Sequence, residues 1–373
     1  MRAIPPWLLR IRRHAAMRRL GKRLETFFKQ GIYRIFLFFC KAPRAADPAH
    51  LENIHRILLL RPNYRIGNTL ISLPLIGVLK HRFPGAQVDY LGADTTAILL
   101  KGLPLDQVFV MSRDFILKPW AYIRLLSRLR RRKYDLLLQV GNGSFSGMIC
   151  MICLGARYRI GAGKWAKELC NLSVDMSAAQ HSYDDPMVVA QLLGVPCRDH
   201  PYYQVTPEER EKAITRLAQE GLAGKPEVRP FIALFVGGHA SKRCSSTFWI
   251  QLTQRLLADQ ARVVVFIGPE EAAMAKEFKA TFPTHALCVM APMPLRDFAA
   301  MLGLARLVVT PDTGPMHLAV ALDVPTAAIL QDQSSVRYAP RGALDRVLFR
   351  PEMDQIYGAL ITHPCWGTVT TDG

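Results

Sequence analysis

Residues 310–325, TPDTGPMHLAVALDVP, place an aspartate, a threonine, a glycine and a histidine within six positions, directly after an apolar run. We expect a buried strand to end here and a helix to begin at Gly314, whose free N–H groups can bind an anion. Asp312 would repel a bare phosphate, so we expect it to accept hydrogen bonds from a sugar or to orient the loop. A lone histidine is usually structural, but after this turn Thr313 and His317 indicate a functional role. The turn predicts a site for the phosphate-bearing half of an activated sugar.

A second loop with suitable chemistry is GGHASKR, residues 237–243, after another apolar run. Gly237 and Gly238 allow a close approach of the backbone to a ligand. Ser241 offers a hydroxyl and Lys242 a point charge, and both suit phosphate oxygens. A glycine turn with an exposed lysine would explain these residues equally well.

The third loop is GPEE, residues 268–271. The carboxylates of Glu270 and Glu271 would suit ribose hydroxyls, although acidic residues are also favourable in the first turn of a helix. The sequence has no G-x-G-x-x-G after its first strand, no P-loop motif, no D-x-D pair at a strand end and no His/Cys set with metal spacing. These absences argue against a dehydrogenase, a P-loop enzyme and a metal-held nucleotide diphosphate.

Strands and helices alternate through most of the chain with short turns, which predicts an α/β fold with parallel sheets. In the first half we expect strands at 54–63, 86–92, 106–111 and 134–141, and helices at 67–83 and 120–133. In the second half we expect strands at 231–238, 261–268, 306–312 and 325–330, and helices at 246–259, 270–282, 295–305 and 314–322. The simplest arrangement is two Rossmann-like domains, 51–205 and 206–373, with ligands in the cleft between them.

The first 50 of the 373 residues carry twelve Lys and Arg side chains against two acids, a net charge of +10 out of +18 for the chain. No apolar stretch is long enough to cross a bilayer, and charges interrupt any signal-peptide pattern. We interpret residues 1–50 as a basic amphipathic helical segment lying on an anionic membrane surface. A solvated arm or an extra helix on the domain would also explain it. Nucleic acid is the other usual partner of such charge, but no recognition motif appears, so we expect none.

Eight cysteines are scattered along the chain, mostly with apolar neighbours. Cys150 and Cys153 form a C-x-x-C inside the apolar run GMICMICLGA, with no second pair, so we expect a buried helix rather than a zinc or redox site. Scattered cysteines with apolar neighbours suggest a reducing compartment, and the cytoplasm fits this and the absence of an export signal.

Three blocks, in order, resemble the bacterial ADP-heptose:lipopolysaccharide heptosyltransferases, glycosyltransferase family 9. The first is ILLLRPNYRIGNTLISLPLIGVLKHRFPGAQVDYLG and the second is HASKRCSSTFWIQL. The third and most specific is APMPLRDFAAMLGLARLVVTPDTGPMHLAVALDVPTAAIL, with its Asp-Thr-Gly-x-x-His. The resemblance spans roughly residues 54–335 and excludes the basic segment.

The resemblance implies a GT-B fold, with the acceptor bound by the N-terminal domain and the nucleotide-sugar donor by the C-terminal one. It implies inverting transfer without a metal or another cofactor. Residues carried over to the donor site are Ser241 and Lys242 for the phosphates, Glu270 or Glu271 for the ribose, Met293 for the adenine, and Asp312, Thr313, Gly314 and His317 for the sugar and diphosphate. The first loop, with Arg61, Arg65 and Gly67, would face the acceptor.

Two positions depart from the family pattern. The family has Gly-Asp in the first loop, and its aspartate is the expected general base, whereas this chain has Gly67-Asn68. A carboxamide cannot take a proton from the acceptor hydroxyl. Three explanations are open. Another group can serve as the base, with Asp94 and His239 as candidates. Alternatively, deprotonation lags bond breaking and Asn68 only positions the acceptor, or the activity is lost. Cys244 also stands where a tryptophan is usual.

The sequence therefore predicts a glycosyltransferase acting at the cytoplasmic face of a bacterial inner membrane. It would move a heptose or related sugar, with ADP-heptose as the expected donor, to a lipopolysaccharide core or surface glycan. The anionic glycolipid acceptor could be held by the cations of the helix at 120–133, or these could form a solvated face. The alternatives are a catalytically inactive homologue that binds nucleotide or glycan and scaffolds assembly, and a membrane- or nucleic-acid-binding protein on a Rossmann-like scaffold.

Overall fold

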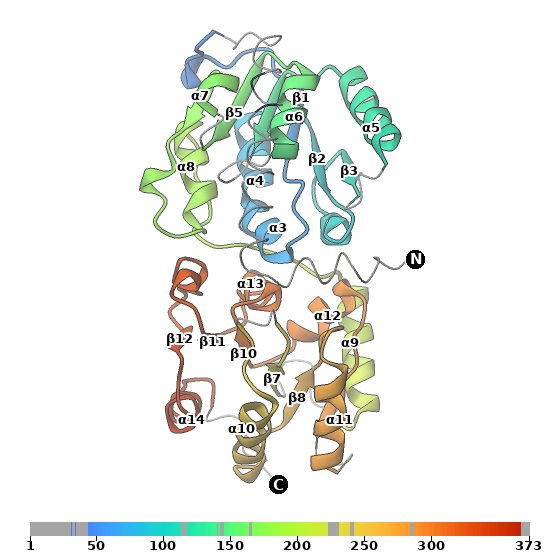
Figure 1. Ribbon diagram of the computed structural model, residues 1–373, viewed down its shortest axis with the longest axis vertical. Helices are drawn as coiled ribbons and strands as arrows, with labels where there is room; N and C mark the ends of the chain where they lie inside the picture. Colours follow the sequence, from blue (N-terminus) through green and yellow to red (C-terminus); the bar gives the residue numbers. More distant parts are fainter. Residues whose placement is uncertain are drawn as a thin grey trace.

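The computed structural model describes residues 31, 34, 44–112, 118–139, 141, 145–163, 166–222, 231–238, 242–283 and 287–366. These residues form two α/β units stacked along the long axis of the molecule (Figure 1). Each unit is built on a six-stranded sheet in which all paired strands are parallel. Most of the basic N-terminal segment, together with the candidate site residues His239 and Ser241, lies outside the described residues.

The first sheet has the strand order β3-β2-β1-β4-β5-β6. Its strands are β1 (Arg56–Leu60), β2 (Gln87–Ala93), β3 (Gln107–Met111), β4 (Leu136–Gln139), β5 (Tyr158–Ala162) and β6 (Leu172–Val174). Its helices are α3 (Ile66–Ser72), α4 (Pro74–Arg82), α5 (Pro119–Arg131), α6 (Phe145–Leu154), α7 (Ala166–Leu169) and α8 (Asp184–Leu192). The central strands are buried on both faces, which explains their continuous runs of leucine and isoleucine.

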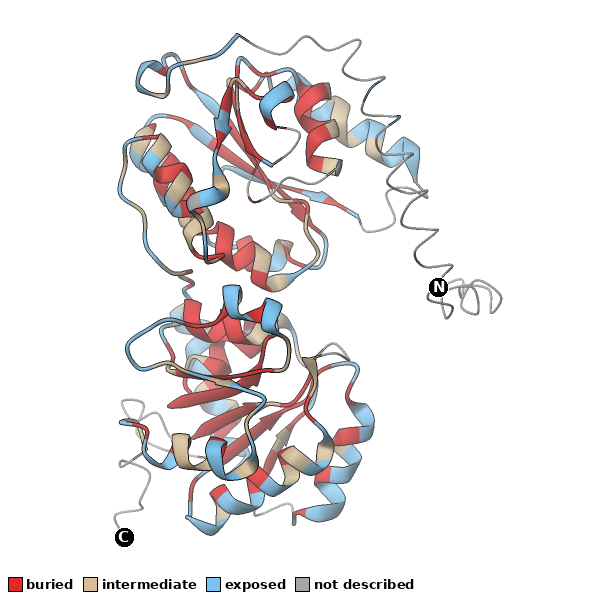
Figure 2. Cartoon of the chain, turned by 60° about the vertical axis from the view of Figure 1, so that its left-hand side comes forward, coloured by how far each residue is buried: buried red, intermediate tan, exposed pale blue. Residues whose placement is uncertain are grey.

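The second sheet has the order β12-β11-β10-β7-β8-β9. Its strands are β7 (Ile232–Phe235), β8 (Val263–Phe266), β9 (Cys288–Met290), β10 (Leu307–Pro311), β11 (Thr326–Leu330) and β12 (Arg346–Phe349). Its helices are α9 (Pro207–Gln219), α10 (Ser246–Ala258), α11 (Ala272–Thr281), α12 (Leu295–Leu302), α13 (Gly314–Ala321) and α14 (Met353–Ile361), and a 3-10 helix, η6 (Gln333–Tyr338), follows β11. In both units the buried residues concentrate in the strands and on the inner faces of the helices (Figure 2).

The single helix expected at 67–83 is wrong, because two helices occupy that stretch. Helix α3 ends at Ser72 and α4 begins at Pro74, which has no backbone N–H to continue the hydrogen-bond ladder. The N–H of Leu73 still bonds the carbonyl oxygen of Leu70, at 3.1 Å. The buried helix around the C-x-x-C is confirmed as α6, where Cys150 is buried and both cysteines are free thiols.

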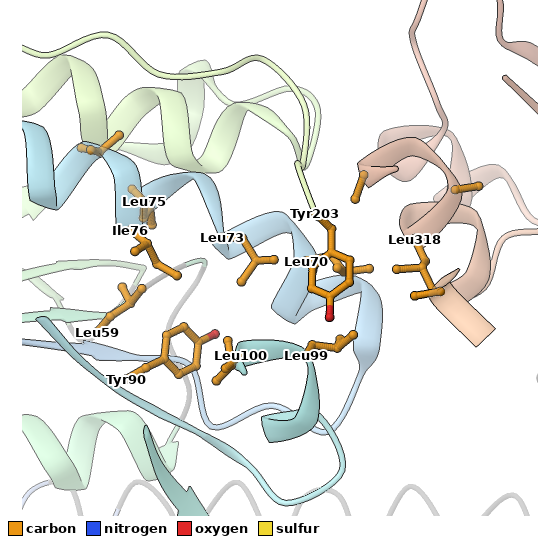
Figure 3. Close-up of a cluster of buried hydrophobic side chains, with 14 of the residues drawn as sticks. Leu59, Leu70, Leu73, Leu75, Ile76, Tyr90, Leu99, Leu100, Tyr203 and Leu318 are labelled. Carbon is orange, nitrogen blue, oxygen red and sulfur yellow. The ribbon is translucent and has the colours of Figure 1, made fainter. Parts of the chain in front are cut away.

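One hydrophobic cluster runs through both units and holds them together. Leu70 of α3 and Leu318 of α13 face each other where the units meet, and Tyr203 of the connecting segment lies beside them (Figure 3). Each of these three side chains is at most 2% exposed. The two helix starts that follow β1 and β10 are therefore brought against each other. No helix among the described residues combines the length and the apolar character needed to span a membrane.

Candidate active site

A close contact between the two units joins the first turns of α3 and α13. A Cβ atom added to Gly67 would lie 2.2 Å from Cδ2 of His317, and one added to Gly314 would lie 3.0 Å from Cβ of Ile66. A side chain at residue 67 would therefore overlap the imidazole, whereas one at residue 314 would require Ile66 to shift by a few tenths of an ångström. The contact places Gly67, the residue before Asn68, against His317 of the Asp-Thr-Gly-x-x-His motif, where the two units meet.

His317 is a buried, neutral side chain at this junction. It is 5% exposed, and its Nδ1 lies 3.0 Å from the hydroxyl oxygen of Tyr183 in the other unit. Burial lowers the pKa of His317 to about 4, opposed by the nearby charge of Asp312. The imidazole is therefore uncharged at neutral pH and acts as a hydrogen-bonding group.

Asp312 and Lys242 form an ion pair beneath the turn. Asp312 is buried at the carboxyl end of β10, and the ammonium group of half-buried Lys242 contacts its Oδ2. The hydroxyl of Thr313 donates to the carbonyl oxygen of Pro311 at 3.2 Å. In this geometry the carboxylate of Asp312 is engaged by the ammonium of Lys242. The ammonium of Lys242 contacts Asp312, two residues before α13 begins, and the N-terminus of that helix also carries partial positive charge.

The two glutamates of the third loop differ in their surroundings. Glu271 is 4% exposed and accepts hydrogen bonds from Arg243 Nη2 at 2.7 Å and from the N–H of Gly238 at 3.3 Å. Glu270 is exposed and lies 3.8 Å from the Arg243 guanidinium. A Cβ atom on Gly268 would lie 2.2 Å from Glu271 Oε2. Glu271 thus fixes the Gly237–Gly238 turn, and Glu270 has the freer carboxylate.

Arg243 is a positioning residue that the sequence interpretation missed. Its Nε and Nη2 donate to the carbonyl oxygen of Gly238 at 3.0 and 2.8 Å, so it ties the second loop to Glu271. Only its place next to Lys242 in the sequence could have drawn attention to it. Met293, expected on the adenine side, is half-buried in the turn between β9 and α12.

The first loop is organised by Arg61. Its Nε donates to the carbonyl oxygen of Asn68 at 3.3 Å, and burial lowers its pKa. The Asn68 side chain is half-buried and, among the described residues, has no recorded hydrogen bond. Arg65 is exposed at the start of α3. Asp94 is exposed after β2, where its carboxylate accepts from the N–H of Thr95 at 2.8 Å.

Asp185 is a further carboxylate near Arg61 that the sequence did not single out. It lies in the first turn of α8, two residues after Tyr183, and helix α8 contacts α3. Burial raises the pKa of Asp185, and the charges of Arg61 and Arg337 act in the opposite direction. Its sequence signal, an acidic pair opening a helix, is too common to mark a site.

A strip of polar contacts fastens the segment before α8 to the C-terminal unit. The N–H of Ser182 donates to the carbonyl oxygen of Arg337 at 2.8 Å, and Arg341 Nη1 donates to Asp184 Oδ1 at 2.6 Å. His181 Nε2 lies 2.9 Å from the carbonyl oxygen of Ala339. These contacts flank the Tyr183–His317 hydrogen bond and join the two units.

Two stacked Rossmann-like units with a polar site where their strand ends meet have the architecture of the GT-B fold. Solved structures agree on the fold. The chain matches ADP-heptose LPS heptosyltransferase II of E. coli with a TM-score of 0.67 and 21% identity, covering 82% of this chain and 97% of that one. It matches E. coli heptosyltransferase WaaC with ADP-2-deoxy-2-fluoro heptose with a TM-score of 0.64 and 20% identity, covering 82% and 97%.

Sequence comparison narrows the class to a family. The model of glycosyltransferase family 9 (heptosyltransferase) matches residues 122–355. Lipooligosaccharide heptosyltransferase 2 of Haemophilus ducreyi is 24% identical over 321 residues, which cover 79% of this chain and 88% of the relative. The chain belongs to glycosyltransferase family 9 and is a glycosyltransferase, as its motifs predict. The first loop with Asn68 lies outside the stretch that the family model matches.

Proposed function

We propose that the protein transfers a heptose from ADP-heptose to a lipopolysaccharide core or related surface-glycan acceptor, with inversion at the anomeric carbon and without a metal. The observation that carries the proposal is the contact of Gly67 with His317, because it joins the expected acceptor loop to the expected donor turn. The names of the relatives support the sugar, and WaaC was solved with an ADP-heptose analogue.

For the donor, we propose that Lys242, Ser241 and the first turn of α13 hold the diphosphate, with Thr313 and Gly314 beside it. The lysine and the helix N-terminus supply positive charge that a metal would otherwise supply. Asp312 then shares the ammonium of Lys242 with the phosphates and bonds the sugar. The carboxylate of Glu270 or Glu271 accepts hydrogen bonds from the ribose hydroxyls, and Met293 lies against the adenine.

For the reaction, the acceptor hydroxyl attacks the anomeric carbon while the bond to the diphosphate breaks, so the products are ADP and an inverted glycoside. Arg61, Arg65 and Gly67 are proposed to face the acceptor. Asn68 positions its hydroxyl but cannot take the proton. The proton goes to a relocated carboxylate or imidazole, with Asp94, His239 and now Asp185 as candidates, or it leaves after bond breaking.

We further propose that the protein works at the cytoplasmic face of the inner membrane, with residues 1–50 on the anionic surface and without a nucleic-acid partner. The charge of that segment, +10 over fifty residues, supports the location. A second function is favoured by one observation, the asparagine at the base position. The chain would then be an inactive homologue that binds nucleotide or glycan and scaffolds assembly.

A binding panel tests the donor assignment. The full-length protein is titrated by calorimetry with ADP, UDP, GDP and their available sugar conjugates. We expect ADP and ADP-heptose to bind at least about tenfold more tightly than the others, with a parallel rise in Tm because only the folded state binds them. Equal affinity for all nucleotides, or none for ADP, would contradict the proposed donor. Tight ADP binding without product formation would favour the inactive homologue.

A further inference from the structure

Helix α5 has an outer face that the fold does not use. Its inner face packs Tyr122, Leu125, Leu126 and Leu129 into the hydrophobic cluster shared with β3 and α6. On the outside, Trp120 is 72% exposed and Ile123 is 50% exposed. An exposed tryptophan at the start of a helix costs apolar hydration and contributes nothing to this core. The helix lies on the outer flank of the N-terminal unit (Figure 1).

The cations of this helix divide into two groups. Arg132 pairs with Asp89 at 2.7 Å, Arg130 donates to the carbonyl oxygen of Cys153 at 3.0 Å, and Arg128 lies over the ring of Phe109. These three are therefore engaged by the N-terminal unit itself.

The remaining cations, Arg124, Arg131 and Lys133, are exposed, and no ion pair or hydrogen bond of their side chains is recorded among the described residues. Residues 118–133 contain no aspartate or glutamate, so nothing within the segment offsets their charge. This second group is available to an anionic partner.

The spacing places the apolar and the free basic residues together. Trp120, Arg124 and Arg131 are four and seven residues apart, so they form one stripe along the helix, with Ile123 adjoining. A solvated face normally alternates charges of both signs and carries no large apolar side chain. A tryptophan with neighbouring cations and no anion is the combination expected at an anionic bilayer surface. There the indole enters the headgroup layer while guanidinium groups meet phosphates.

The position of the stripe suits an enzyme whose expected acceptor is carried by a membrane. All strands of the first sheet are parallel, so their carboxyl ends lie on the same side of the sheet. Helix α5 follows β3 and therefore starts on the side where the loop after β1 also begins. That loop carries Arg61, Arg65 and Asn68. Trp120 and Ile123 lie in the first turns of α5, nearest that edge. A bilayer touching this end of the helix would lie on the side of the expected acceptor loop.

We propose that the outer face of α5, defined by Trp120, Ile123, Arg124 and Arg131, docks the N-terminal unit on an anionic phospholipid bilayer. This surface is separate from residues 1–50, and it orients the unit on the membrane, whereas a basic arm would only tether it. The inference does not depend on the sugar or nucleotide proposed above. The partner is the phospholipid headgroup layer, and binding that requires the glycolipid acceptor is one outcome of the test.

The test measures sedimentation of the full-length protein with vesicles that contain no glycolipid, made from 70 mol% phosphatidylethanolamine and 30 mol% phosphatidylglycerol. Arg124→Glu/Arg131→Glu should weaken partitioning about tenfold or more, since each cation near an anionic surface contributes appreciably. Trp120→Ser should weaken it several-fold at high salt, where screening suppresses the ionic part. Lys276→Glu/Lys279→Glu on α11, exposed cations of the other unit, gives the same change in net charge as a matched control.

The proposal is overturned if both α5 variants partition like the wild type, or if the α11 control loses as much binding as the double arginine variant. It is also overturned if the wild type binds only after glycolipid acceptor is added, because the arginines would then recognise substrate. Loss of duplex-DNA binding in the α5 variants, with vesicle binding unchanged, would assign the surface to nucleic acid instead. Thermal unfolding of each variant shows whether it is folded, and Tm should stay near that of the wild type because the substituted side chains are exposed.

Discussion

Gly67 and His317 touch across the junction between the two units, and a single methyl group on residue 67 would overlap the imidazole ring. The two residues come from the helix starts that follow β1 and β10, 250 positions apart in the chain. The contact sets how closely the expected acceptor loop approaches the expected donor turn.

Gly67→Ala should therefore force the units apart. Because a displacement of about 1 Å at a reaction centre can cost roughly 100-fold in rate, we expect turnover to fall by about that factor. Gly77→Ala in α4 is the matched control, since a Cβ atom there meets nothing within 4 Å. That substitution should raise the free energy of unfolding by roughly 0.5–1 kcal/mol and leave turnover unchanged. Wild-type turnover in Gly67→Ala would show that the contact does not set the working geometry.

Lys242→Ala should weaken ADP binding by roughly 1.5–3 kcal/mol, the range for a hydrogen bond to a charged group. Titration calorimetry measures the loss. Asp312→Asn provides the comparison, because it removes the charge that holds the lysine in the present structure. We expect that variant to keep ADP affinity and lose turnover with ADP-heptose. Unchanged ADP affinity in Lys242→Ala would remove the lysine from the donor site.

The stability of the protein should fall in acid through His317. Its pKa in the folded state, about 4, lies below the ordinary value of 6.5, so the unfolded state takes up the proton first as the pH falls. The lost stability appears below pH 6.5 and reaches about 2 kcal/mol at pH 5. Denaturant unfolding at pH 8 and pH 5 should show this loss in the wild type and a smaller one in His317→Gln. Equal losses in the two proteins would mean that His317 is not held neutral.

Asn68→Asp tests the missing base. If position 68 supplied the base, a carboxylate there should raise turnover by about 100- to 10,000-fold. We expect a neutral or harmful effect, because a new carboxylate would repel the donor diphosphate. Asp94→Asn, His239→Ala and Asp185→Asn should then identify the relocated base by loss of turnover with ADP affinity retained. A large gain in Asn68→Asp would contradict a relocated or dispensable base.

The parallel strands could be predicted from the sequence because a strand that is buried on both faces consists of a continuous run of apolar residues. The Asp312–His317 turn was recognisable for the same reason, since polar residues directly after such a run lie at the carboxyl edge of the sheet. The split between α3 and α4 had a signal in Pro74 that the apolar periodicity around it obscured. Strands β6 and β9 have only three residues each, Arg159 interrupts the apolar run of β5, and β12 is a partly exposed edge strand, so none of these four stands out as a buried apolar run.

The contacts that assemble the site join residues far apart in the chain, and no local sequence pattern predicts them. Tyr183 and His317 are 134 residues apart, and neither position predicts the other. The charges of Arg61 and Asp185 interact because α8 packs beside α3. Pairing of this kind depends on how the elements pack, whereas a single sequence reports mainly periodicity and turn chemistry.

A transfer assay tests the central claim most directly. Purified full-length protein is incubated with ADP-heptose and a lipopolysaccharide core acceptor that lacks the heptose, and ADP release, product mass and anomeric configuration are measured. We predict stoichiometric ADP and a product heavier by one heptose with inverted configuration, lost in Lys242→Ala. ADP-heptose that binds but yields no product in wild type or in any variant at position 68 would contradict the assignment of a heptosyl transfer reaction.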